Sequence, residues 1–95
     1  MLTVIIYDIE ETKNRNDLIK KLRHYGLKRI QKSVFSGYLD QEKRNKIKNE
    51  IEENILSEKD SIIQLEICEN CKDRITAIGN NKIPSDKEEE YMVLI

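Results

Sequence analysis

The run from Leu2 to Tyr7 constrains the fold more than any other segment of the chain. Its sequence, LTVIIY, is β-branched and almost continuously apolar, which is typical of a strand buried on both faces. Asp8 ends the run abruptly, so its carboxylate is expected at the carboxyl end of that strand. Open sheets often place functional sites at such strand ends, which makes Asp8 the first candidate residue.

A helix and two strands are predicted next. Gly26 supplies a left-handed stop for the helix, which follows a polar turn at residues 10–14. The apolar residues at helical spacing are Leu18, Ile19, Leu22 and Tyr25. The segment from Lys28 to Leu39 then indicates two short strands around a bend, with a bulge expected at Gly37.

The following segment predicts a second helix and another strand. Asp40 suits an N-cap, and isoleucines repeat every four residues, so the helix is expected to reach about Leu56. Residues 61–67 alternate in polarity, which predicts a strand with two different sides. One side carries Ile63, Leu65 and Ile67, and the other carries Gln64 and Glu66.

The resulting order is β-α-β-β-α-β, an α+β fold of the ferredoxin-like type with both helices on one face of the sheet. The terminal residues Tyr91–Ile95 end in three aliphatic side chains, so an additional C-terminal strand is expected at a sheet edge of this protomer or another. A chain of 95 residues is expected to form one domain, with a core at about 1–79 and a tail at 80–95. A core this small leaves a monomer thinly stable, which favours a homodimer.

Basic residues concentrate in one stretch, although the formal net charge of the chain is only −1. Between residues 13 and 32 there is a single acid, Asp17. The basic residues there are Lys13, Arg15, Lys20, Lys21, Arg23, Lys28, Arg29 and Lys32. One electropositive face is therefore expected to bind a polyanion such as double-stranded DNA or RNA. The alternative is an ordinary solvated helix face.

The sequence shows no sign of membrane insertion or export. No apolar run approaches the length of a membrane span, and the N-terminus lacks the pattern of a secretory signal. Two cysteines in such a chain are expected to be reduced thiols. These observations predict a cytoplasmic protein with no membrane partner.

Two roles are open for Asp8. An aspartate after a strand commonly accepts a hydrogen bond within a turn. One carboxylate holds a hard cation poorly, but two copies of Asp8 near a dimer axis would complete a Mg²⁺ shell with water or phosphate oxygens. Such an ion activates a water and stabilises charge during in-line attack on a phosphodiester. The second role predicts that Asp8 is both the metal ligand and the catalytic residue.

Cys68 and Cys71 form a Cys-x-x-Cys pair. The spacing suits half of a zinc site, with His24 as the remaining possible ligand, or a zinc shared across a dimer. A thioredoxin-like pair lies at a helix start after an early strand, whereas this pair follows the last core strand. Two reduced structural thiols are favoured, and His24 is expected on the surface. Without a Gly-rich phosphate loop, a Ser/His/Asp set or an HExxH motif, ATPase, acyl-transfer and metalloprotease chemistry has no support.

Four motifs, in this order, resemble the small CRISPR-associated Cas-two (Cas2) proteins. They are the strand ending Tyr7-Asp8-Ile9, the helix opening Asn14-Arg15-Asn16, the run GLKRIQKSVFSG from Gly26 to Gly37, and the Cys-x-x-Cys after the fourth strand. The similarity covers about the first 80 residues. The combination of YDI with QxSVFxG makes it specific.

The resemblance implies a ferredoxin-like homodimer that works with the Cas-one integrase in acquiring foreign-DNA spacers. It also implies a metal-dependent endonuclease, which cleaves phosphodiesters of RNA or double-stranded DNA with Mg²⁺. A non-catalytic DNA-binding scaffold of the integrase complex is one alternative. An RNA-cleaving toxin of the virulence-associated D type, which shares this compact fold, is another.

The resemblance also implies roles for single residues. Asp8 matches the metal-binding aspartate and Tyr7 the aromatic residue before it, while Arg15 and Arg29 match basic residues that face phosphate. The aromatic of the SVF element is Phe35, which core packing also explains. Asp17 departs from the family pattern, because many relatives have a second basic residue there. The remaining residues of the expected nucleic-acid surface are Lys20, Arg23 and Lys28.

Overall fold

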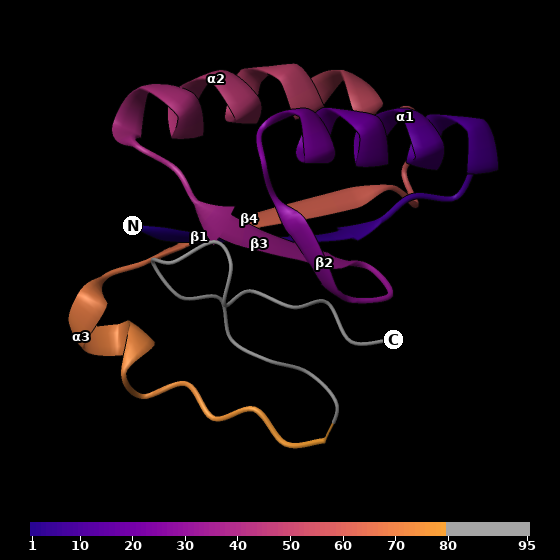
Figure 1. The fold of residues 1–95 in the computed structure, drawn as a ribbon. Helices are drawn as coiled ribbons and strands as arrows, with labels where there is room; N and C mark the ends of the chain where they lie inside the picture. The colour runs from indigo at the N-terminus through magenta and orange to yellow at the C-terminus, as the bar shows by residue number, and fades with distance from the viewer. Residues whose placement is uncertain (80–95) are drawn as a thin grey trace.

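A computed structural model describes residues 1–79 of the chain, which form a four-stranded sheet with helices on both sides (Figure 1). The elements are β1 (Leu2–Asp8), α1 (Thr12–His24), β2 (Lys28–Gln31), β3 (Val34–Tyr38), α2 (Gln41–Ile51), the 3₁₀ turn η1 (Glu52–Asn54), β4 (Ser61–Ile67) and α3 (Glu69–Lys72). The ferredoxin-like α+β prediction is confirmed. The C-terminal strand predicted at Tyr91–Ile95 lies outside the described residues.

The sheet has the order β2-β3-β1-β4, and every neighbouring pair is antiparallel. β1 is central, which agrees with its apolar sequence. Ile5 pairs with Phe35 on one side and with Gln64 on the other. Ile6 pairs with Val34 and with Ile63. Because residues directly opposite each other share a face of the sheet, these two sets of three define its two faces.

The helices begin and end for identifiable reasons. α1 begins at Thr12, earlier than its apolar spacing indicates, and its C-terminus leads into Gly26 at φ 85°, which confirms the left-handed stop. Asp40 caps α2 as predicted, its Oδ1 accepting a hydrogen bond from the Lys43 amide at 2.8 Å. The end of α2 was predicted too late, because the chain tightens into η1 after Ile51.

The predicted bulge at Gly37 is wrong. Gly37 pairs regularly with Thr3, and the register shift lies instead in β2, between Arg29 and Gln31. A Cβ on Gly37 would lie 2.9 Å from Leu27 Cδ2, so glycine permits a close approach of the β3 backbone to the segment before β2.

The hydrophobic core lies between one face of the sheet and helices α1 and α2, which both cover that face (Figure 1). Its largest members include Ile5, Tyr7, Leu18, Leu22, Phe35, Ile47 and Ile51. α3 lies on the opposite side of the sheet (Figure 1). Within residues 1–79 no helix has the length and apolar character needed to cross a membrane.

The opposite face of the sheet, here called the open face, is less buried than the sequence predicts. Val4 and Ile6 of β1 are half-buried there, and their cross-strand neighbours Leu65 and Ile63 are 44% and 52% exposed. The expectation that β1 is buried on both faces is therefore wrong at Val4 and Ile6, although Leu2 on the same face is 1% exposed. The alternation predicted for β4 is present, but its aliphatic side faces away from the two long helices.

Candidate functional site

Asp8 is the last residue of β1 and lies on the open face. It pairs in register with Ser61, two positions from Ile6, and its side chain is exposed. Within residues 1–79 no hydrogen bond or ion pair reaches its carboxylate, so the turn hydrogen bond considered from the sequence is not formed there. Among the described residues, nothing therefore competes with an external ligand for the carboxylate oxygens.

Arg15 fixes the loop that follows Asp8. Its guanidinium lies one turn into α1 and donates from Nη1 to the Ile9 carbonyl oxygen at 3.1 Å and from Nη2 to Thr12 Oγ1 at 3.1 Å. The side chain is half-buried. Arg15 therefore connects the start of α1 to the chain directly beyond Asp8, and only part of its hydrogen-bonding capacity remains for phosphate.

Tyr7 connects the same end of the sheet to the β2–β3 hairpin. Its backbone amide donates to the Ser33 carbonyl oxygen at 3.0 Å, and its hydroxyl donates to the Lys32 carbonyl oxygen at 3.3 Å. The ring is 3% exposed and lies 6.2 Å, between centroids, from the ring of Phe35. Tyr7 and Phe35 therefore support the site from the core, and neither ring is available for a ligand.

Two arginines that are six positions apart in the sequence converge on Phe35. The guanidinium carbons of Arg23 in α1 and Arg29 in β2 lie 5.9 Å and 5.3 Å from the ring centroid. These distances are typical of cation–π contacts. Nε of Arg29 is buried without a hydrogen-bond partner in the described part of the chain. Lys28, at the start of β2, is the next residue along this edge of the sheet. Arg23 and Arg29 thus form one cationic group, named the β2-edge cluster here, on the face packed against α1, whereas Lys28 pairs with Ser36 and lies on the open face of the same strand.

The rest of the basic stretch does not join this cluster. Lys20 lines a groove of about 360 Å³ that also contains the acidic residues Glu50 and Glu53. Lys21 is held by Glu53 at 2.8 Å and by Asp17 at 3.3 Å. The sequence stretch therefore divides between a β2 edge rich in cations and an α1–α2 groove where acids offset them.

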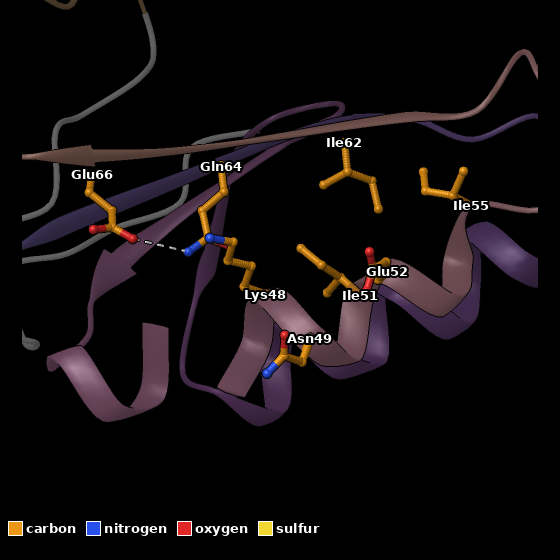
Figure 2. Close-up of a pocket in the computed structure, with 8 residues that line it drawn as sticks. All are labelled: Lys48, Asn49, Ile51, Glu52, Ile55, Ile62, Gln64 and Glu66. Carbon is orange, nitrogen blue, oxygen red and sulfur yellow. Dashed lines mark hydrogen bonds between the residues drawn. The ribbon is translucent and has the colours of Figure 1, made fainter. Parts of the chain in front are cut away.

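A second groove lies between α2 and β4 (Figure 2). It has a volume of about 380 Å³, and its apolar wall consists of Ile51, Ile55 and Ile62, whose side chains point toward one another (Figure 2). Gln64 Nε2 lies 3.4 Å from Glu66 Oε2 at one end of the groove (Figure 2). None of the site residues predicted from the sequence lines this groove. Sequence reasoning gave no signal for it, because its residues come from two distant elements.

A metal site does not form within residues 1–79 of one chain. No group of three or more histidine, cysteine, aspartate or glutamate side chains is placed there to hold an ion. Asp8 supplies the hard oxygen ligands that Mg²⁺ prefers, but it supplies them alone. Within residues 1–79 of one chain, Asp8 therefore provides only part of the ligand set that a divalent cation needs.

Comparisons with known proteins extend these observations. The family model described as "CRISPR associated protein Cas2" matches residues 1–75. A protein of Methanospirillum hungatei named "CRISPR-associated endoribonuclease Cas2 1" is 37% identical over 71 residues, which are 75% of this chain and 75% of the relative. A protein of the same name from Archaeoglobus fulgidus is 30% identical over 88 residues, which are 93% of this chain and 94% of the relative.

Two solved structures have the same fold. The crystal structure of Streptococcus pyogenes Cas2 at pH 6.5 superposes with a TM-score of 0.69 and 25% identity, covering 83% of this chain and all of that one. A hypothetical protein of Thermus thermophilus, TT1823, gives a TM-score of 0.74 at 24% identity over 88% of this chain and 96% of that one. The second likeness shows the fold alone.

Proposed function

Because the chain belongs to the CRISPR associated protein Cas2 family, we propose that it is a metal-dependent endonuclease of CRISPR adaptation that cleaves RNA or double-stranded DNA. The relatives are named endoribonucleases, which supports RNA as the first substrate to test. The observation that carries the proposal is Asp8, an exposed carboxylate at the end of the central strand with no partner within residues 1–79. The proposed compartment is the cytoplasm.

A homodimer that pairs the open faces is the proposed active unit. Ile63 and Leu65 are 52% and 44% exposed on the edge strand of this face, and Val4 and Ile6 on the central strand beside them are half-buried. Burying such side chains contributes about 25 cal/mol per Å² of apolar surface removed from water. Asp8 lies at the end of the same face. A two-fold axis near that end brings two copies of Asp8 together.

The residues of the proposed site have distinct roles. The two Asp8 carboxylates hold one Mg²⁺, with water and phosphate oxygens completing its ligands. When bound, the ion supplies an activated water and stabilises charge on the phosphodiester. Arg15 and Tyr7 keep Asp8 in place, because one fixes the loop after it and the other fixes the strand before it.

Nucleic acid is proposed to contact the basic residues through its phosphates. Arg15 holds the loop that follows Asp8, and the β2-edge cluster of Arg23 and Arg29 lies at the sheet edge two strands from β1. Lys28 lies at the same edge on the open face. Lys20 remains in the proposed surface, with the smallest expected contribution because Glu50 and Glu53 share its groove. Changing Lys20, Arg23 and Lys28 together to alanine is expected to reduce the slope of log affinity against log salt. The slope falls by about 0.9 for each phosphate of duplex DNA that the variant no longer neutralises.

A matched control for that measurement is Lys46→Ala, which removes an exposed lysine of α2 that pairs with Glu42. The slope of this variant is expected to equal that of the wild type. Equal slopes for the triple variant and the wild type would exclude the proposed surface.

A cleavage assay tests the proposed activity directly. Wild type, Asp8→Ala and Glu58→Gln are incubated with RNA and with duplex DNA, in Mg²⁺ and in chelator. Asp8→Ala is expected to abolish cleavage while dimerisation and nucleic-acid binding stay largely intact. Glu58→Gln removes an exposed carboxylate of the turn before β4 and is expected to cleave normally. Cleavage by Asp8→Ala, or equal cleavage in chelator, contradicts the proposal.

The proposed partner is the Cas-one integrase, with which the dimer acquires spacers. Spacer acquisition by Asp8→Ala separates hydrolysis from scaffolding within this role. Loss of acquisition supports a catalytic contribution, whereas unchanged acquisition assigns the dimer to a non-catalytic DNA-binding scaffold of the integrase complex.

A further inference from the structure

Cys68 and Cys71 lie one helical turn apart at the start of α3, directly after β4. The Lys72 amide donates to the Cys68 carbonyl oxygen at 2.8 Å, which closes this turn. Residues three positions apart in a helix lie on the same side, with Cβ atoms roughly 5–6 Å apart. A disulfide requires Cβ atoms roughly 3.5–4.5 Å apart. A small adjustment of the turn therefore brings the two sulfurs into bonding distance.

The two sulfurs are chemically unequal. The pKa of Cys68 is lowered from its usual value, chiefly because the backbone and thiol of Cys71 beside it favour the Cys68 thiolate. The pKa of Cys71 is raised, because the neighbouring Cys68 sulfur favours its protonated thiol and opposes a second negative charge. Cys71 is exposed and Cys68 half-exposed, so a small reagent in solvent reaches the pair. Cys68 is the better nucleophile, and Cys71 is placed to attack a mixed disulfide formed on Cys68.

The surroundings favour chemistry between the two cysteines over metal binding. In the described part of the chain, no third ligand stands near enough to complete a metal site. The chain contains no other cysteine, so only one intramolecular disulfide can form. The pair also lies at the opposite end of β4 from Ser61, the residue paired with Asp8, and is therefore separate from the proposed nuclease site.

We propose that Cys68 and Cys71 form a reversible oxidation site that exchanges with small disulfides of the glutathione type. The Cys68 thiolate attacks one sulfur of the small disulfide, forming a mixed disulfide and releasing one small thiolate, which takes up a proton. Cys71 then loses its proton to solvent and attacks the Cys68 sulfur, which releases the second small thiolate. Two cysteine thiols are oxidised and one small disulfide is reduced to two thiols. Disulfides of cytosolic proteins are usually transient and redox-sensing, which suits this pair.

A redox titration of the full chain tests the proposal. The protein is equilibrated with chelator in glutathione buffers of increasing oxidised fraction, quenched in acid, alkylated and weighed by mass spectrometry. The two thiols are expected to disappear together, with the loss of two hydrogens and no link between chains. A stable mixed disulfide on one cysteine, or a disulfide between two chains, overturns the proposal. So does a pair that stays reduced throughout, or protection of the thiols by added Zn²⁺ in place of oxidation.

Single-cysteine variants test the order of attack. Cys71→Ser is expected to take up glutathione on Cys68 several-fold faster than Cys68→Ser takes it up on Cys71. Equal rates would contradict the assigned nucleophile. Asp8→Ala is expected to titrate like the wild type, so failure of the nuclease proposal leaves this one intact and the reverse also holds.

Discussion

The two faces of the sheet carry similar aliphatic side chains but differ sharply in burial. On the face packed against α1 and α2, Ile5 and Phe35 are 0% exposed. On the open face, Ile63 and Leu65 remain 52% and 44% exposed, although they pair with the same central strand. The apolar sequence of β1 therefore serves two different packing layers. One is supplied by this chain's own helices, and the proposed dimer supplies the other.

The first prediction concerns a buried side chain of the covered face, whose removal is expected to lower the free energy of unfolding the most. Phe35→Ala removes a ring that packs against Tyr7 and under two guanidiniums. The loss is expected to be about 3–5 kcal/mol of unfolding free energy, measured by urea titration. That is a large share of the roughly 5–15 kcal/mol typical of a domain.

The control for Phe35→Ala is Val34→Ala, its neighbour in β3 on the open face. Val34 is half-buried and pairs with Ile6, so its truncation is expected to cost clearly less when measured at low protein concentration. Equal losses for the two variants would show that the faces do not differ in the way described.

The second prediction places a charge on the open face. Leu65→Lys is expected to weaken the proposed dimer by about 2 kcal/mol or more, which is about a 30-fold higher dissociation constant. A desolvated ammonium in an apolar interface has no partner to offset its lost hydration. Sedimentation of the variant against the wild type measures the effect, and circular dichroism checks that the fold is kept. A dimer of unchanged affinity would place the interface elsewhere.

Local patterns in the sequence predicted those parts of the fold that depend on neighbouring residues. The cap at Asp40 and the stop at Gly26 needed only short-range chemistry, and the strand Ser61–Ile67 has the predicted bounds. The same patterns said nothing about which side of β4 the helices cover. Alternation shows that a strand has two sides, but the layer that packs on it decides which one is buried.

The candidate site likewise has one part that the sequence predicted and another that depends on tertiary packing. Asp8 was predicted at the carboxyl end of a strand from its place after an apolar run, and it is the last residue of β1. The convergence of Arg23 and Arg29 on Phe35 depends on how α1 packs beside β2, and no sequence spacing reveals it. The acidic neighbours of Lys20 come from the end of α2 and η1, about thirty positions away, so counting charges along the chain overstated the continuity of the basic face.

The third prediction concerns a buried polar pair within the covered layer. Asn54 is 1% exposed, and its Nδ2 donates to Asn14 Oδ1 at 2.7 Å while Asn14 Nδ2 donates back to the Asn54 carbonyl oxygen at 2.7 Å. Asn54→Ala leaves the Asn14 amide oxygen without this donor, at a cost of about 1–3 kcal/mol of unfolding free energy. Asn49→Ala, at an exposed position of α2, is the control, and both are measured by urea titration. A neutral Asn54→Ala would mean that helix packing is set by the apolar side chains alone.

The fourth prediction concerns Asp60, in the turn before β4, and the change in unfolding free energy expected there is smaller than the others. The amide of Glu10 donates to the Asp60 carboxylate at 2.9 Å, and the amides of Leu56 and Ser57 donate at 3.0 and 3.2 Å. These hydrogen bonds hold the pKa of Asp60 below its usual value of 3.8. Asp60 therefore connects the turn before β4 to the loop that follows Asp8.

A lowered pKa in the folded state gives stability that is present above pH 3.8 and is lost as the pH falls through the folded value. The difference in unfolding free energy between the wild type and Asp60→Asn is therefore expected to be constant near neutral pH and to shrink in acid. Urea titrations across this pH range measure it, with Glu58→Gln in the same turn as a carboxylate that accepts none of these hydrogen bonds. A difference that does not change with pH would mean that Asp60 acts through the shape of its hydrogen bonds and not through its charge. An asparagine side chain at position 60 would then hold the loop beyond Asp8 as well as the aspartate does. Protonation of Asp60 in acid would then not weaken the Asp8 end of the sheet.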